Sequence, residues 1–143
     1  MYQKTTLANG LRIVSESIPY MSSISLGIFA GTGSRHETPA EQGVSHFIEH
    51  LMFKGTHRRS AKDIAEMVDD VGGQLNAATD RENTCYYIKV LPEHLSLGMD
   101  ILSDMLLNSK FADVDVEKER QVVLEEISLY EDSPDELIHD LHM

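Results

Sequence analysis

Residues 43–55, GVSHFIEHLMFKG, contain apolar side chains and histidines, and each set recurs at the spacing of an α-helix. Apolar residues recur there at i, i+3, i+4 and i+7, which is the spacing of one buried helical face. These residues are Val44, Phe47, Ile48 and Leu51. On the opposite side lie His46, Glu49 and His50, and the two histidines are one helical turn apart. The segment therefore predicts an amphipathic helix with two imidazoles on its polar face.

Two imidazoles at i and i+4 can bind one divalent ion, and neutral imidazole suits zinc. A catalytic zinc keeps three protein ligands and leaves one position for water, whose pKa falls to about 7. Glu49 would then stand beside that water as its general base. The order H-x-x-E-H is the H-E-x-x-H zinc helix read backwards and is known as the inverzincin motif. The alternative is a solvated helix face with two ordinary histidines.

A second segment, residues 113–130, could supply a third metal ligand. Its side chains at steps of three and four share one face, which includes two carboxylates: Val116, Glu119, Val123, Glu126 and Tyr130. A carboxylate turned toward a core needs a cation or a hydrogen-bond donor, and a zinc ion that lacks one ligand is such a cation. Either acid could bind the ion while the other supports a ligand, and the spacing does not choose between them. Both acids could instead be solvated.

The other segments mix strand and helix patterns without strict alternation. Strands are expected at 2–7, 11–17, 22–29, 74–79 and 83–91, and helices at 43–55, 60–71, 92–108, 113–130 and 134–143. Asn9-Gly10 favours a type I′ hairpin turn, and Ser60 with Asp63 forms a helix-capping pattern. The apolar face of the 92–108 helix is expected to contain Leu95, Met99, Leu102 and Leu106. The sequence predicts an α+β domain of two layers, with helices packed on one face of a mostly antiparallel sheet.

Charge and composition exclude several classes of partner. The net charge of −12 argues against nucleic acid and against anionic membrane surfaces. The chain contains no run of about 18 apolar residues, and its N-terminus lacks the apolar core of a signal peptide. Cys85 is the single cysteine, so an internal disulfide is excluded. These features favour a reducing cytoplasm, and 143 residues are enough for one domain with its own core.

The motifs together resemble the pitrilysin, insulysin and mitochondrial processing peptidase family of zinc metallopeptidases, especially its smaller bacterial members. The resemblance extends from the N-terminal hairpin to the end of the chain. It is carried by HFIEH at 46–50 and by ERQVVLEEI at 119–127, together with GTGSR at 31–35, FKGT at 53–56 and GGQLNA at 72–77. It implies a zinc-dependent endopeptidase that processes extended peptides.

The resemblance also implies a role for each site residue. Zinc would be held by His46, His50 and Glu126, which resolves the choice between the two acids. Glu49 would activate water, and Glu119 would be the supporting carboxylate. The expected cofactor is one Zn²⁺ ion per chain.

Substrate contacts follow from the same resemblance. The peptide would lie extended against an edge strand that begins at Gln74 and includes Asn76, Ala77 and Ala78, because strand addition reads the backbone and tolerates varied side chains. Phe53 matches a position that lines the pocket for the residue after the cut, although simple core packing is the alternative.

Two acidic residues near the C-terminus suggest a preference for basic substrates. Glu136 and Asp140 match positions where mitochondrial processing peptidases hold an arginine, and at i and i+4 they would share a helix face. A pair of carboxylates suits a guanidinium group. Because the whole chain is acidic, the same pair could equally be an ordinary solvated helix end.

Family members are usually longer, with a second homologous domain that contributes transition-state donors. Residues 1–143 are therefore expected to be an incomplete N-terminal zinc-binding domain, which alone would be a poor catalyst. The expected partners are a peptide or unfolded polypeptide and a second homologous domain or subunit, and the chain could also form a homo-oligomer.

Two other functions fit parts of the pattern. S-ribosylhomocysteine lyase shares the H-x-x-E-H helix but uses cysteine as the third metal ligand, and only Cys85 is present here. A non-catalytic peptide-binding or scaffold subunit of a processing complex is the other alternative.

Overall fold

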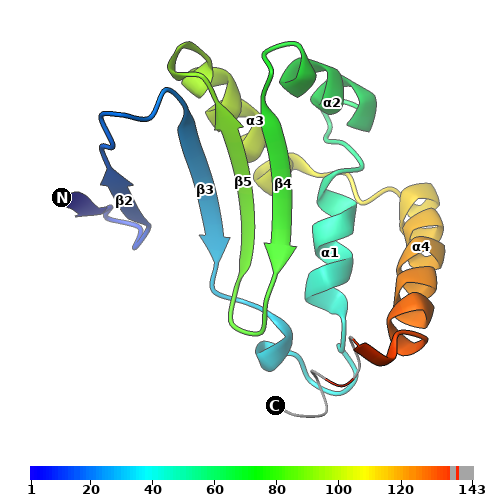
Figure 1. The fold of residues 1–143 in the computed structure, drawn as a ribbon. Coiled ribbons are helices and arrows are strands. Elements are labelled where there is room, and N and C mark those ends of the chain that lie inside the picture. Colours follow the sequence, from blue (N-terminus) through cyan, green and yellow to red (C-terminus); the bar gives the residue numbers. More distant parts are fainter. Residues whose placement is uncertain (136–137, 139–143) are drawn as a thin grey trace.

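A computed structural model describes residues 1–135 and 138, which form an α+β fold (Figure 1). The strands are β1 (Tyr2–Thr6), β2 (Arg12–Glu16), β3 (Ile24–Ala30), β4 (Gln74–Thr79) and β5 (Thr84–Val90). The α-helices are α1 (Val44–Met52), α2 (Ala61–Asp69), α3 (Leu95–Asn108) and α4 (Asp113–Glu131), and short 3-10 helices are η1 (Ser34–His36) and η2 (Pro92–His94). Most of the predicted elements are confirmed, and the predicted helix at 134–143 lies largely outside the described residues.

Three antiparallel strands form the central sheet in the order β3-β5-β4. In register, Ile88 of β5 stands between Leu26 of β3 and Leu75 of β4. Alternate residues of β5, from Thr84 to Val90, are buried beneath the helices, whereas the residues between them point to the open face of the sheet. In Figure 1 α3 lies behind the strands, α1 stands beyond β4, and α4 stands beyond α1. The predicted two-layer architecture is therefore confirmed.

The turn that joins β1 and β2 differs from the predicted type I′ turn. A type I′ turn needs positive φ at both central residues, but Gly10 has φ 88° whereas Asn9 does not have a positive φ. The Gly10 N–H donates to the Leu7 carbonyl, and the Leu7 N–H donates to the Leu11 carbonyl. The loop therefore has three residues, a hairpin form in which one residue with positive φ is enough.

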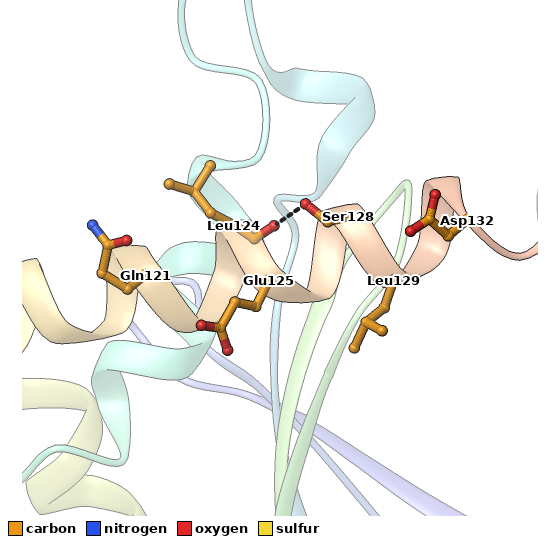
Figure 2. A pocket seen from close by; sticks show the side chains of 6 residues that line it. All are labelled: Gln121, Leu124, Glu125, Ser128, Leu129 and Asp132. Carbon is orange, nitrogen blue, oxygen red and sulfur yellow. Dashed lines mark hydrogen bonds between the residues drawn. The ribbon is translucent and has the colours of Figure 1, made fainter.

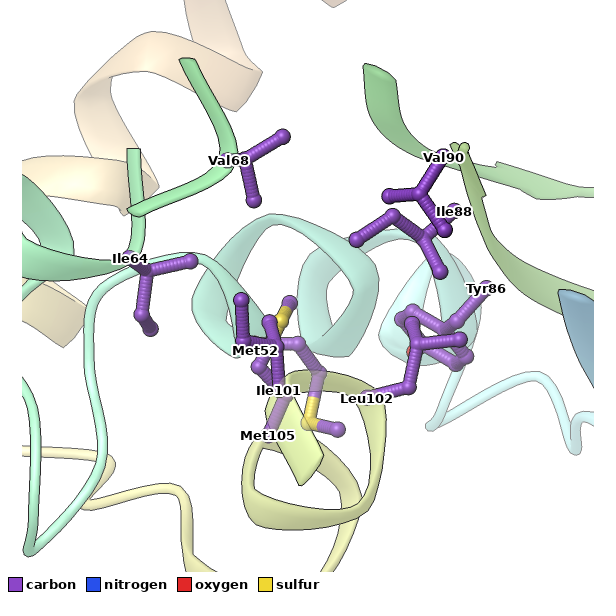
Figure 3. Close-up of a cluster of buried hydrophobic side chains, with 9 residues drawn as sticks. All are labelled: Met52, Ile64, Val68, Tyr86, Ile88, Val90, Ile101, Leu102 and Met105. Carbon is purple, nitrogen blue, oxygen red and sulfur yellow. The ribbon is translucent and has the colours of Figure 1, made fainter. Parts of the chain in front are cut away.

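Nine buried apolar side chains form the core between the sheet and the helices (Figure 3): Met52, Ile64, Val68, Tyr86, Ile88, Val90, Ile101, Leu102 and Met105. The predicted face of α3 is confirmed only at Leu102, which is buried, because Leu95, Met99 and Leu106 are exposed. This helix is apolar on most sides, so its spacing fits several faces. Gly98 decides between them, because a Cβ atom there would lie 3.0 Å from Ile88 Cγ2, so the lack of a side chain lets this face approach β5 closely.

The apolar stripe of α1 is only partly buried. Leu51 is buried, but Val44 and Ile48 are each 40% exposed, which contradicts their predicted burial. Both line a hollow of about 310 Å³ that is also lined by Leu106 and Phe111. The first turns of α1 therefore face an apolar space that the described residues do not fill.

Backbone pairing holds α4 beside α1. The segment that follows α1 bonds to the connection between α3 and α4, where the His57 N–H donates to the Asn108 carbonyl and the Lys110 N–H donates to the Gly55 carbonyl. α4 consequently begins near the C-terminal end of α1, packs against it and runs antiparallel to it (Figure 1). Among the described residues, no helix has the length and apolar character needed to cross a bilayer.

Candidate metal centre

Antiparallel packing of α1 and α4 brings two histidines and one glutamate together. His46 Nε2 lies 3.0 Å from His50 Nε2, and Glu126 Oε2 lies 3.3 Å from the same His50 atom and 3.8 Å from His46 Nε2. The two rings meet edge to face, with centroids 4.5 Å apart. Of the two acids on the inner face of α4, Glu126 is the one that reaches both Nε2 atoms.

The spacing of these three atoms fits a zinc ion. Donors about 2.0–2.1 Å from a tetrahedral zinc lie about 3.3–3.4 Å apart. The observed separations of 3.0, 3.3 and 3.8 Å bracket that value. Two imidazoles and one carboxylate are also a donor set that catalytic zinc sites use, and they leave a fourth position for water. The residues present therefore suit this ion in both chemistry and spacing.

Glu119 lies behind His50 and is the buried acid of α4. Its side chain is 6% exposed, and its Oε1 is 3.1 Å from His50 Nδ1 while its Oε2 is 2.5 Å from Lys54 Nζ. Burial alone would raise the pKa of Glu119, but the contacts with Lys54 and His50 outweigh it and lower that pKa. A carboxylate at this position accepts the Nδ1 proton of His50, which leaves the Nε2 lone pair free to bind a metal.

Glu49 is held from the sheet side by a chain of hydroxyl groups. The Thr79 hydroxyl at the end of β4 donates to Glu49 Oε2 at 2.5 Å and lies 3.4 Å from the Thr84 hydroxyl, which donates to the Thr32 carbonyl at 3.0 Å. Burial, together with the negative charge of Glu49, raises the pKa of Tyr86 to about 12. Tyr86 therefore stays neutral at physiological pH, and the Glu49 carboxylate is held at one oxygen by Thr79.

The N-terminus of α1 is capped by a carboxylate from the preceding loop. Glu37 accepts hydrogen bonds from the backbone N–H of Gly43 at 2.7 Å and from that of Ser45 at 2.8 Å. The bond from Ser45 has the largest effect on the pKa of Glu37, which lies below its ordinary value. This cap satisfies two N–H groups that the helix itself leaves unpaired, and so it fixes where the histidine-bearing helix begins.

The structure separates the predicted substrate residues into three groups. Asn76 and Ala78 are exposed on β4, an edge strand of the described sheet, and Ala77 is turned toward the core. Phe53 is partly buried and packs against the core cluster, and its role in a substrate pocket stays a prediction. Glu136 and Asp140 lie outside the described residues, so the preference for arginine stays a prediction.

Cysteine is not part of this cluster. Cys85 lies on the central strand between Thr84 and Tyr86, and it points to the open face of the sheet, whereas both neighbours point toward the helices. The group of potential metal ligands found among the described residues consists of His46, His50 and Glu126. The cysteine ligand that the lyase arrangement needs is thus absent from this group.

A separate hollow of about 440 Å³ lies along the outer surface of α4 (Figure 2). Its lining residues are Gln121, Leu124, Glu125, Ser128, Leu129 and Asp132. All belong to α4 or to its C-cap, so no second element in the described part of the chain encloses a ligand there. The Ser128 hydroxyl, the only one in this lining, donates to the Leu124 carbonyl of its own helix at 3.0 Å. This surface is separate from the histidine cluster.

Sequence reasoning missed two residues that contact the site, Lys54 and Thr79. Lys54 follows His50 by four residues, which is a helical spacing, but α1 ends at Met52 and the lysine lies in the turn beyond it. Thr79 ends β4 directly before the polar connection to β5. Neither type of residue is a metal ligand, and both act across elements, so no local pattern marked them.

Comparisons with known proteins identify the family. The family model described as insulinase, peptidase family M16, matches residues 12–143. The uncharacterized zinc protease YmxG of Bacillus subtilis is 52% identical over 99% of this chain and 34% of its own length. An uncharacterized zinc protease of Streptomyces coelicolor is 50% identical over 97% of this chain and 30% of its own length. The chain thus spans about a third of the length of the curated relatives it matches.

A solved structure extends the likeness to three dimensions. The crystal structure of a protease from Helicobacter pylori matches with a TM-score of 0.90 and 30% identity, and it covers 96% of this chain and 33% of that protein. The match of the family model extends over more than nine-tenths of the sequence and includes the histidine helix and α4. The chain belongs to the insulinase family, peptidase family M16.

Proposed function

We propose that this chain is the zinc-binding domain of a metalloendopeptidase that hydrolyses extended peptides. The observation that carries this proposal is the convergence of His46, His50 and Glu126 at separations that suit a tetrahedral zinc ion. The names of the relatives as zinc proteases support the same class of reaction. The ligand set also favours a peptidase over the lyase, because its third member is a carboxylate.

The residues around the ligands have distinct roles in this mechanism. When bound, zinc would polarise the scissile carbonyl and lower the pKa of a water molecule to about 7. Glu49 takes a proton from the attacking water and later returns it to the leaving amine. Thr79 keeps the Glu49 carboxylate in one orientation, and Glu119 keeps His50 in the tautomer that can bind metal.

The peptide would pair with the edge of β4. In the described sheet β5 occupies one side of β4, and α1 packs beside this strand. An extended peptide added to the other side would receive main-chain hydrogen bonds, with Asn76, Ala77 and Ala78 alongside it. Thr79 connects the same strand to Glu49, so the peptide backbone would be placed close to the general base.

A second homologous domain or subunit completes the proposed enzyme. The matched relatives are about three times as long as this chain, since it covers 34% and 30% of two of them. The β1 and β2 hairpin also exposes both of its strands, and an isolated two-stranded hairpin is marginally stable in water. We expect the partner domain to supply transition-state donors, so that the isolated chain binds zinc but cleaves peptides poorly.

The test is a Glu49→Gln substitution in the full-length protein, with cleavage of an unfolded polypeptide and zinc content measured on the same sample. We expect cleavage to be lost while one zinc per chain is retained, because glutamine cannot take the proton and Glu49 is not a ligand. Glu125→Gln, on the outer face of α4, is the matched control and should keep full activity. Normal cleavage by the Glu49→Gln protein would exclude Glu49 as the base.

A further inference from the structure

Lys54 contacts Glu119, the carboxylate behind the metal centre, and is not itself a candidate metal ligand. Its ammonium nitrogen lies 2.5 Å from Glu119 Oε2, and the other oxygen of Glu119 lies 3.1 Å from His50 Nδ1. The Glu119 side chain is nearly fully buried, whereas the Lys54 side chain is partly exposed. Glu119 is thus held at both oxygens, by a lysine on one side and by a predicted zinc ligand on the other.

We propose that Lys54 is a positioning residue for zinc binding and acts through Glu119 on His50. By holding one oxygen of Glu119, Lys54 fixes the other oxygen against His50 Nδ1, and this keeps His50 Nε2 turned toward His46 and Glu126. The inference rests on the proposed function, because it requires that these residues bind zinc. It adds to that function a residue that is neither a ligand nor a base.

The burial of Glu119 explains why it needs a second partner. A carboxylate removed from water is costly unless its oxygens are paired with cations or donors. Without Lys54, Oε2 of Glu119 would lose its cation while remaining buried, and the side chain would turn toward another donor. The bond to His50 Nδ1 would then weaken, and the imidazole would lose the partner that sets its orientation and tautomer.

Electrostatics alone predicts the opposite result for loss of Lys54. A lysine ammonium near a divalent cation repels it, so deletion of the lysine charge would strengthen zinc binding if no other effect existed. Positioning through Glu119 predicts weaker binding. The direction of the change in zinc affinity therefore separates the two effects.

The experiment is a competition titration of the chain with Zn²⁺ and a chromophoric chelator. The variants are Lys54→Met, Lys54→Arg, Glu119→Gln and the double variant Lys54→Met/Glu119→Gln. Lys62→Met is the matched control, because Lys62 is an exposed lysine of α2 that pairs with Glu66 rather than with the site. Circular dichroism on each sample reports whether the variant is folded.

We expect Lys54→Met to weaken zinc binding about 10-fold, at the low end of the range for partners that orient metal ligands. Lys54→Arg should restore affinity to within about threefold, because arginine keeps the cation and its donors. Lys62→Met should bind like the wild type. The double variant should be no weaker than Glu119→Gln alone, because glutamine already lacks the charge through which Lys54 acts.

Unchanged or tighter binding by Lys54→Met would overturn the proposal, and so would additive effects in the double variant. Failure of the wild-type chain to bind zinc would instead count against the proposed function itself. If Lys54→Met does not fold, NMR of the wild-type lysine ammonium groups decides the question. We expect a persistent signal for Lys54 that is lost in Glu119→Gln, and the absence of that signal in the wild type would overturn the proposal.

Discussion

Replacement of Asp104 by asparagine should lower the free energy of unfolding by about 3 kcal/mol, since loss of one partner from a buried ion pair costs about 3–5 kcal/mol. The Asp104 side chain is 1% exposed. It accepts hydrogen bonds from Thr56 Oγ1 at 2.7 Å, from Arg59 Nη1 at 2.6 Å and from Asn108 Nδ2 at 2.9 Å. Asparagine keeps the shape and one acceptor oxygen, and Arg59 retains Asp100 as a partner, so the low end of the range applies.

Asp100→Asn is the matched control for this prediction. Asp100 pairs with the same Arg59 and also with Arg58, but its side chain is 44% exposed. The substitution removes the same charge from the same arginine, and exposed ion pairs contribute only about 0–1 kcal/mol. The two variants therefore differ mainly in the burial of the carboxylate.

The pH dependence provides a second test of the Asp104 ion pair. Burial alone would raise the pKa of Asp104, but hydrogen bonds from Thr56, Asn108 and Arg59 hold that pKa below its ordinary value. A carboxylate with a lowered pKa in the folded state stabilises the protein above its unfolded pKa, about 3.9, and this contribution is lost as the pH falls through the folded value. The difference between wild type and Asp104→Asn should therefore be full at pH 7 and shrink below about pH 4.

Urea denaturation followed by circular dichroism at pH 7 and at pH 3.5 measures these differences. Two outcomes would refute the reasoning: equal losses of stability for Asp104→Asn and Asp100→Asn, or a loss below about 1 kcal/mol for Asp104→Asn. Because Thr56 belongs to the segment that pairs with the connection between α3 and α4, its hydrogen bond to Asp104 also helps to hold α4 beside α1.

Two further substitutions, tested by the same denaturation assay, concern the loop that precedes α1 and the cap of that helix. Gly33→Ala should cost about 1–3 kcal/mol, because a Cβ atom there would lie 2.1 Å from a backbone oxygen of the loop between β4 and β5. A Cβ atom at Gly31 would meet open space, so Gly31→Ala should be tolerated. Equal losses of stability for Gly31→Ala and Gly33→Ala would contradict the steric reason. Glu37→Ala should cost about 1 kcal/mol through loss of the α1 cap. Glu41→Ala, which removes bonds to Thr38 only, should cost less, and the reverse order would exclude the cap as the cause.

The fold could be predicted where a particular residue type determines the local backbone structure, such as the start or end of a helix. Ser60 and Asp63 form the predicted capping box, and α2 ends at Asp69, two residues before the end predicted from the glycines that follow it. The face of α3 could not be read in this way, because Gly98 contributes no hydrophobicity and its importance lies in a close approach to Ile88. The hairpin turn was missed for a similar reason, since Asn9-Gly10 suits both two-residue and three-residue loops.

In the candidate site, too, only the contacts within one helix could be predicted from the sequence. His46 and His50 belong to one helix, so their proximity follows from helical spacing. Glu119 and Glu126 share a face of α4, and only the antiparallel packing against α1 decides which acid reaches the two Nε2 atoms. Lys54 contacts Glu119 across two elements, and such contacts depend on tertiary packing that no sequence period encodes.

Diffraction from crystals of the chain grown with zinc, measured on both sides of the zinc absorption edge, tests most directly whether His46, His50 and Glu126 hold a single ion. We expect one anomalous difference peak about 2.0–2.1 Å from both Nε2 atoms and from one oxygen of Glu126. The absence of a peak at this position, or a peak bound by Glu119 in place of Glu126, would contradict the proposed metal site.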